Sequence, residues 1–158
     1  MKEKSAGETT VEIETRDMTP DDMEDVMSIE SVSFPTPWSR GMFLEEMRHP
    51  FCHDLVGITG GRIIGYISFA IVYNETHLRN LAVHRDWKRR GVASELLAQM
   101  MDISLDNNAG YAVLEVRKSN EAALALYMKF GFVVKGTRPR YYSDTGEDAL
   151  IMWADFWN

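Results

Sequence analysis

Apolar residues recur along the chain at two spacings, one typical of helices and one typical of strands. The most regular helical spacing lies in the middle of the sequence, where an apolar stripe contains Val92, Leu96, Met100 and Ile103. We therefore expect an amphipathic helix that begins at Val92. It should close at residues 107–110, where Gly110 can adopt the left-handed conformation that ends many helices.

Three further helices are bounded by start and stop signals. Residues 19–22, Thr-Pro-Asp-Asp, predict a helix start, because threonine can cap, proline suits the first helical position and aspartates complement the helix dipole. The prolines within residues 34–38 end that helix. Ser39 then caps a short helix that ends before Pro50, and a last helix is expected over residues 120–130.

Alternation of apolar and polar residues, with turn residues between the runs, predicts strands. One run, 62–73, is apolar on both faces, with Ile63 and Ile67 on one side and Ile64 and Tyr66 on the other. This pattern is typical of a central strand that is covered on both sides. The full set of expected strands spans residues 11–17, 54–59, 62–73, 76–83, 111–116, 133–140 and 147–157.

The elements follow the order β-α-α-β-β-β-α-β-α-β-β. This order predicts an α/β domain, with helices on the faces of one mixed sheet. At 158 residues the chain is most simply a single domain, which we expect to span residues 11–158. Residues 1–10 are polar and lack an apolar signal segment, so they predict a flexible N-terminal tail.

Composition and charge narrow the class of protein. Apolar residues make up 45% of the chain, and the formal net charge of −7 suits a cationic partner without identifying one. The single cysteine, Cys52, permits no internal disulfide, which fits a reducing compartment. Since no apolar run approaches the roughly 20 residues that cross a bilayer, we expect a cytoplasmic protein without a membrane partner.

A basic, glycine-containing turn at residues 88–94, Lys-Arg-Arg-Gly-Val-Ala-Ser, runs into the helix at Val92. The first N–H groups of a helix have no partner within it and carry partial positive charge, so such a turn suits a phosphate group. Gly91 allows close approach of the backbone, and Arg89 and Arg90 can add charged contacts. Taken alone, a solvated basic turn is an equally good interpretation, whereas the acidic chain disfavours nucleic acid.

The four histidines do not predict a metal site. His49 and His53 are four residues apart, but Pro50 argues against one helical face. His77 and His84 fall in a strand and a loop, with no accompanying pattern of cysteines or carboxylates.

Several segments in a fixed order resemble the GNAT superfamily of N-acetyltransferases: 78–83 (LRNLAV), 89–93 (RRGVA), 114–120 (LEVRKSN) and 125–132 (ALYMKFGF). Within that superfamily the sequence is similar to the RimI family of ribosomal-protein-alanine N-acetyltransferases in the runs LEVR with Ser-Asn, 34–39 (FPTPWS), 141–142 (YY) and 146–149 (GEDA). The resemblance covers about residues 11–157. Each motif alone is weak, but the set in this order is specific.

The resemblance implies that acetyl-CoA is the acetyl donor and a protein N-terminal α-amine the acceptor, here the N-terminal alanine of a small-subunit ribosomal protein. It implies a donor site made of strand backbone, basic turn and helix start: Leu81, Ala82, Val83, Lys88, Arg89, Arg90, Gly91, Val92, Ala93, Ser94, Asn120 and Tyr127. Lys88 departs from the glutamine or arginine that begins the family's turn. A lysine still supplies a hydrogen-bond donor and a positive charge, so acetyl-CoA binding should be retained.

By the same resemblance, Glu115 is expected to be the general base and Tyr127 the general acid. Glu115 falls at the carboxyl end of a predicted strand, where ligands gather in α/β sheets, and partial burial would raise its pKa and strengthen it as a base. The structural alternatives are a Glu115–Arg117 ion pair and a packed core tyrosine at Tyr127. Asn120 can equally cap its helix.

The acceptor end of the site is less sharply defined. Trp38, Tyr141 and Tyr142 are expected to wall a peptide groove, although each can also anchor a loop. Several carboxylates could attract a cationic N-terminus, or instead be loop anchors or solvated charges, namely Glu30, Asp144, Glu147 and Asp148.

The leading hypothesis is therefore an acyltransferase that uses acetyl-CoA and no metal, does not bind nucleic acid, and is a monomer or weak dimer. One alternative is a related enzyme that acetylates a small-molecule amine or an internal lysine. The loops at the acceptor end would decide between these acceptors. A second is a non-catalytic acetyl-CoA-binding module. The presence of both Glu115 and Tyr127 argues against that module.

Overall fold

The computed structural model describes residues 12–156, so the predicted tail at 1–10 lies outside the described residues. Its elements follow the predicted order, which confirms the fold class. They are β1 (Glu14–Asp17), α1 (Met23–Ser33), α2 (Arg40–Arg48), β2 (Cys52–Thr59), β3 (Arg62–Val72), β4 (Glu75–Val83), α3 (Val92–Asp106), β5 (Tyr111–Arg117), α4 (Glu121–Lys129), β6 (Val133–Tyr142) and β7 (Glu147–Asp155). Single 3₁₀ turns precede α1 and α3, at Pro20–Asp22 and Arg85–Trp87.

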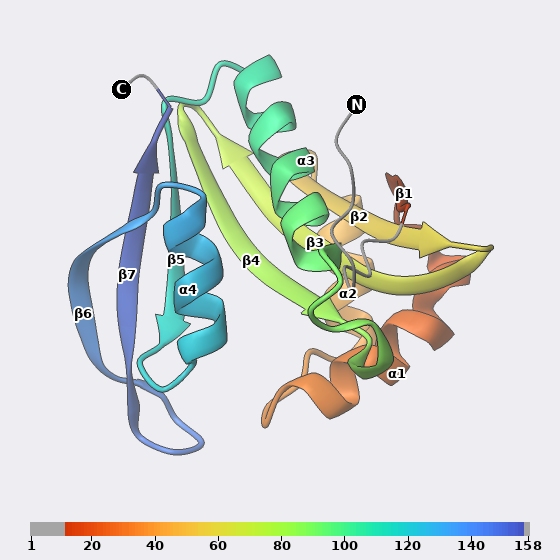
Figure 1. Ribbon diagram of the computed structural model, residues 1–158, viewed down its shortest axis with the longest axis horizontal. Coiled ribbons are helices and arrows are strands. Elements are labelled where there is room, and N and C mark those ends of the chain that lie inside the picture. The colour runs from red at the N-terminus through yellow and green to blue at the C-terminus, as the bar shows by residue number, and fades with distance from the viewer. Residues whose placement is uncertain (1–11, 157–158) are drawn as a thin grey trace, which may run out of the picture.

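The strands form one seven-stranded sheet in the order β1-β2-β3-β4-β5-β7-β6. The central pair, β4 and β5, is parallel, and the other neighbouring strands are antiparallel. The parallel ladder joins residues 75–77 to 111–113 and then stops, although both strands continue. The strands therefore diverge, and Figure 1 shows the V-shaped opening between their carboxyl ends.

Helices cover the sheet on both faces. Figure 1 shows α3 and α4 in front of the sheet and α1 and α2 behind it. The front core joins both halves of the sheet and includes Ile67, Leu96, Met100, Leu114 and Tyr127. The rear core lies under α1 and α2 and includes Met23, Val26, Phe43, Val56 and Tyr66.

The strand β3 is buried on both faces, as predicted, but the assignment of two residues to those faces was wrong. Its register with β2 shifts, so that Ile64 is an extra residue between two paired positions. This bulge reverses the alternation. Ile64 therefore joins the front core with Ile67, while Ile63 joins the rear core with Tyr66.

The end of α3 also differs from the prediction. Asn108, with φ of 61°, takes the left-handed conformation that the sequence had suggested for Gly110. The N–H of Ala109 donates to Ser104 O and the N–H of Asn108 donates to Leu105 O, at 2.9 and 3.1 Å. This is the hydrogen-bond pattern of a Schellman motif, in which asparagine can replace glycine.

None of the helices in the described part of the chain is long and apolar enough to cross a membrane.

Candidate active site

A cleft of about 870 Å³ opens where β4 and β5 separate. Its walls come from both diverging strands, the starts of α3 and α4, the loop before α2 and the turn between β6 and β7. Almost all of the predicted site residues line it: Trp38, Leu81, Ala82, Val83, Lys88, Arg89, Gly91, Val92, Ala93, Ser94, Glu115, Asn120, Tyr127, Tyr141 and Tyr142.

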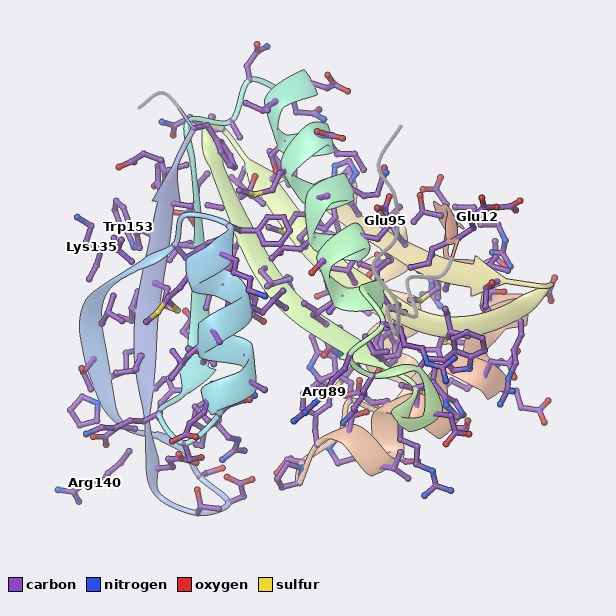
Figure 2. All side chains as sticks on the ribbon, viewed as in Figure 1. Glu12, Arg89, Glu95, Lys135, Arg140 and Trp153 are labelled. Carbon is purple, nitrogen blue, oxygen red and sulfur yellow. The ribbon has the colours of Figure 1, made fainter. Side chains whose placement is uncertain are left out.

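The basic turn at the base of the cleft is built from left-handed backbone. Gly91 has φ of 85° and is the N-cap of the 15-residue helix α3, while Arg89 has φ of 62°. Left-handed residues placed next to a helix start turn successive N–H groups toward one side, which creates a concave site for an anion. Figure 2 places Arg89 below the start of α3, at the open end of the V. The turn can therefore hold a phosphate group.

Arg90 is the one predicted donor-site residue that the structure places outside the lining of the cleft. Its guanidinium lies over the ring of Trp87, 4.9 Å from the ring centre. A cation over an aromatic face is a favourable contact that fixes the arginine against the preceding 3₁₀ turn. The positive side chains that this turn brings to the cleft wall are thus Lys88 and Arg89.

The edge of β4 that faces the cleft is unpaired at residues 81–83, where backbone contacts to the acetyl donor were predicted. Residues 81–83 pair with β3 on one side, whereas the ladder to β5 ends at His77. In the described part of the chain, the β5-facing side of this stretch has no strand partner. Its backbone groups can accept an extended ligand as an added strand would.

The carboxylate of Glu115 is held by His77, a residue that no motif in the sequence links to it. His77 Nε2 lies 2.7 Å from Glu115 Oε2, and the Glu115 side chain is 14% exposed. This hydrogen bond lowers the pKa of Glu115 below its usual value, against the effect of burial. The expectation that burial would raise that pKa was therefore wrong, because the imidazole favours the charged carboxylate.

The proximity of His77 and Glu115 could not be read from their separation in the sequence. It follows from the parallel ladder, in which His77 pairs with Val113, two residues before Glu115. Residues two apart on a strand share a face. The sequence predicted that each residue lies on a strand. It did not predict that these two strands are neighbours in the sheet, which is what brings His77 to Glu115.

Tyr127 also lines the cleft and comes from α4, where it is part of the front core. The residue is 8% exposed and its ring packs edge-on against Phe132, with centroids 5.8 Å apart. Burial raises the pKa of its phenol, so the hydroxyl keeps its proton at neutral pH. Asn120 lines the cleft and also caps α4, since its Oδ1 accepts from the N–H of Ala123 at 3.2 Å.

The carboxylate of Glu30 anchors the acceptor end of the cleft. It is 1% exposed and accepts hydrogen bonds from the hydroxyl of Tyr66, from Asn80 Nδ2 at 2.8 Å and from the N–H of Trp38 at 2.9 Å. These contacts tie α1, β3, β4 and the loop before α2 together. Of the two interpretations of Glu30, the structure supports the loop anchor.

The other acidic candidates are also engaged. Arg117 Nη2 donates to Asp144 at 2.7 Å, and its Nη1 lies 3.5 Å from Glu147. The same guanidinium lies 4.0 Å from the ring centre of Tyr142, and Thr36 donates to Asp144 across the mouth of the cleft at 3.3 Å. The hydrogen bond from Arg117 lowers the pKa of Asp144. Together these contacts hold the turn between β6 and β7 in place. Asp148 Oδ1 accepts from the N–H of Arg140.

Aromatic rings form the rest of the acceptor end. Trp38 packs on Phe43 with centroids 5.1 Å apart, and Tyr141 packs edge-on against Tyr142 at the same separation. Burial raises the pKa of Tyr142 to about 12, so this phenol is uncharged at neutral pH. Trp38, Tyr141 and Tyr142 all line the cleft, and their role as the walls of a peptide groove stays a prediction.

The structure also bears on two other kinds of chemistry, a cysteine nucleophile and a bound metal ion. Burial, together with the contact to Glu46, raises the pKa of the Cys52 thiol to about 12, so it is a poor nucleophile at neutral pH. Among residues 12–156, His, Cys, Asp and Glu side chains do not gather in any group that could hold a metal ion.

Comparisons with known proteins agree with this geometry. Residues 23–132 match the family model described as the acetyltransferase (GNAT) family. A Bacillus subtilis relative, provisionally named ribosomal protein bS18-alanine N-acetyltransferase, is 36% identical over 87% of this chain and 92% of its own. The crystal structure of the Escherichia coli ribosomal-protein-alanine N-acetyltransferase superposes with a TM-score of 0.84, at 29% identity, over 91% of this chain and 94% of its own.

A more distant structure shares the fold and contains a coenzyme. The PaiA N-acetyltransferase of Thermoplasma acidophilum, solved in complex with coenzyme A, superposes with a TM-score of 0.79 at 18% identity. The match covers 92% of this chain and all of that one.

Proposed function

Because this chain belongs to the acetyltransferase (GNAT) family, we propose that it moves an acetyl group from acetyl-CoA to the N-terminal alanine of a small-subunit ribosomal protein. The chain is a GNAT acetyltransferase whose relatives carry RimI-type names. The acceptor is inferred from those names, since the relatives act on ribosomal protein bS18. The observation that carries the proposal is a single cleft lined by Glu115, by Tyr127 and by the basic turn.

The residues present fit acetyl-CoA. The turn at 88–91 offers a concave anion site for the pyrophosphate, with Lys88 and Arg89 beside it. The unpaired edge of β4 at residues 81–83 offers backbone groups for the amide-containing arm. Glu115 and Tyr127 line the same cleft, and we place the acetyl group beside them. When bound, acetyl-CoA supplies the thioester carbonyl that the amine attacks and the thiolate that leaves.

Glu115 is the residue proposed to take a proton from the acceptor amine, directly or through a water. An α-amine has a reference pKa of about 7.7–8.0, so only a modest driving force is needed to obtain its neutral form. The carboxylate is ionised at neutral pH because His77 holds Oε2. His77 thereby fixes the orientation of the base.

Tyr127 is the residue proposed to give a proton to the departing sulfur. Its phenol is protonated at neutral pH because burial disfavours the phenolate. The amine proton goes to Glu115, the phenolic proton goes to the thiolate, and the new amide bond forms as the thioester bond breaks. Proton transfers from positioned groups of this kind contribute about 10²–10⁴-fold each to the rate.

A peptide panel tests the acceptor. Ten-residue peptides that differ only in their first residue, Ala, Ser, Gly, Met or Lys, are incubated with acetyl-CoA and the product is fragmented in a mass spectrometer. We expect the acetyl group on the α-amine, with Ala as the preferred first residue. Acetyl groups found only on lysine side chains, or only on small amines added as competitors, would overturn the acceptor assignment.

A further inference from the structure

The carboxylate of Glu30 is buried, and the proposed chemistry does not use it. Its three hydrogen-bond partners are all neutral. The hydroxyl of Tyr66 and Nδ2 of Asn80 both donate to Oε1, and the N–H of Trp38 donates to Oε2. Burying a carboxylate among neutral groups costs more free energy than burying an apolar side chain of the same size. The position of Glu30 therefore points to a role beyond packing.

Glu30 holds the loop of residues 34–38, which joins α1 to α2. Two residues of this loop, Pro35 and Pro37, have no N–H to donate. The next N–H along the chain belongs to Trp38, and it donates to Glu30 Oε2 at 2.9 Å. Glu30 thus fixes the backbone of the loop at the residue whose side chain lines the cleft.

The ring of Trp38 is held by a second set of contacts that leads back to the same carboxylate. It packs on Phe43, with centroids 5.1 Å apart, and Phe43 packs edge-on against Tyr66, with centroids 5.7 Å apart. The hydroxyl of Tyr66 then donates to Glu30. Because both sets of contacts end at Glu30, the loss of its oxygens would loosen the ring and the loop together.

Trp38 and Glu115 lie on the same side of the sheet. Along β5, Leu114 and Val116 point into the front core, so Glu115 points to the rear. Trp38 packs against the rear core, and Figure 1 shows α1 and α2 behind the sheet, with α3 in front of it. The basic turn that is proposed to hold acetyl-CoA leads into α3. We therefore expect an acceptor that approaches Glu115 from the rear to contact Trp38.

We propose that Glu30 is a positioning residue for the acceptor, because it holds Trp38 at the part of the cleft wall that the acceptor contacts. This inference rests on the proposed function, which brings a polypeptide acceptor into the cleft. Since Glu30 acts through Trp38 and not on the reacting atoms, its loss should weaken acceptor binding and spare the chemical step. A contact made equally in the bound substrate and in the transition state changes KM and leaves kcat unchanged.

Two substitutions of Glu30 test its hydrogen bonds. Glu30→Met keeps the length of the side chain but offers no oxygen to the N–H of Trp38. For a peptide that begins with alanine, we expect the KM to rise by about tenfold, with kcat and the dissociation constant for acetyl-CoA within about twofold of wild type. Glu30→Gln keeps one oxygen for Trp38, and the amide of Asn80 can turn its own oxygen toward the new NH₂ group. This variant should stay within about threefold of wild type.

A double-mutant cycle tests whether Glu30 acts through Trp38. Trp38→Ala alone should raise the KM for the same peptide by about tenfold. Because the wall is then already lost, Glu30→Met should add less than about twofold in that background. Effects of the two substitutions that multiply, or a Trp38→Ala variant with the wild-type KM, would overturn the positioning role.

Ser104→Ala is the matched control for a loss of stability alone. Ser104 is a buried residue of α3 that accepts a hydrogen bond from the hydroxyl of Thr76 at 2.7 Å, and neither residue lines the cleft. It should lower the free energy of unfolding in urea and leave the acceptor KM unchanged. If Glu30→Met does not fold, Tyr66→Phe replaces it, since that change removes one hydrogen bond and keeps the ring on Phe43. Its acceptor KM should rise by about threefold.

Three results would overturn the positioning role while the proposed function stands. They are a wild-type acceptor KM in both Glu30→Met and Tyr66→Phe, a fall in kcat without a change in KM, and an equal rise in KM in Ser104→Ala. If the wild type acetylates no peptide at its N-terminus, the proposed function itself is rejected, and the inference that rests on it is rejected too.

Discussion

The contact between His77 and Glu115 determines the protonation state of the proposed base. A carboxylate in a partly buried wall would ordinarily gain a raised pKa, yet here the imidazole lowers it. The rate of the enzyme near neutral pH is therefore not controlled by ionisation of Glu115. Its role depends on position, which His77 fixes through a 2.7 Å contact between its Nε2 and Oε2 of the carboxylate.

Replacing Glu115 by glutamine tests the base. Glu115→Gln keeps the size of the side chain but removes the proton acceptor, so kcat should fall by about 10²-fold or more. The dissociation constant for acetyl-CoA should stay within about twofold, since phosphate and backbone contacts lie elsewhere. Steady-state rates and calorimetric titration measure the two effects.

Glu24→Gln, on the exposed first turn of α1, is the matched control and should behave as wild type. An unchanged kcat in Glu115→Gln would remove Glu115 from the base role.

The hydrogen bond from the N–H of Ala123 to Asn120 should stabilise the start of α4. Asn120→Ala removes the cap on Ala123 and should lower the free energy of unfolding by about 1 kcal/mol. Asn120→Ser restores a capping oxygen and should recover that stability. Urea denaturation of the three proteins makes the comparison, and equal stabilities would show that the cap contributes nothing.

At the scale of elements, local patterns predicted the type and order of each helix and strand, because helix caps, prolines and apolar period act over a few residues. The swap of Ile63 and Ile64 between faces was missed because a bulge depends on the partner strand, and β2 is not visible in the pattern of β3. The same reason hid His77, whose partner comes from β5. The predicted site residues make up about half of the residues that line the cleft, and the rest depended on how the elements pack together.

The carboxyl group of Asp54 is buried, which disfavours its charged form. Asp54 on β2 is 6% exposed, and its Oδ1 lacks a hydrogen-bond partner within residues 12–156. Burial raises its pKa to about 6 against the effect of the neighbouring Ser68 hydroxyl, with Glu46 and Asp17 adding to the rise and Arg79 opposing it. Because the folded-state pKa exceeds the unfolded value, the folded state prefers the protonated acid, and stability from this group is lost as pH rises toward 6.

Asp54→Asn should therefore stabilise the protein in a pH-dependent way. At pH 7.5 the gain in free energy of unfolding should be about 2–3 kcal/mol, and at pH 4.5 it should shrink to about 1 kcal/mol, following the shift in pKa. Urea titrations at the two pH values measure it. Asp102→Asn, on the exposed face of α3, should show no such difference. A gain that is equal at both pH values would contradict the raised pKa of Asp54.

At the scale of the whole molecule, the sheet is held together at its centre by a short parallel ladder and by the front core. The divergence of β4 and β5 leaves a cleft lined by the basic turn, by Glu115 and Tyr127, and by the aromatic residues Trp38, Tyr141 and Tyr142. In the proposed function, acetyl-CoA is held by the basic turn and the acceptor amine reaches Glu115 past the aromatic residues. This arrangement makes the transfer of an acyl group to an amine the function that the fold supports best.

The most direct measurement is a competition between two peptides in one tube with acetyl-CoA. One has a free N-terminal alanine and no lysine, and the other has the same sequence with a blocked N-terminus and a single internal lysine. Intact mass spectrometry over time should show acetylation of the first peptide by the wild type, at a rate about 10²-fold lower in Glu115→Gln, with the second peptide unmodified. Preferential acetylation of the lysine peptide, or equal rates for wild type and Glu115→Gln, would contradict the account.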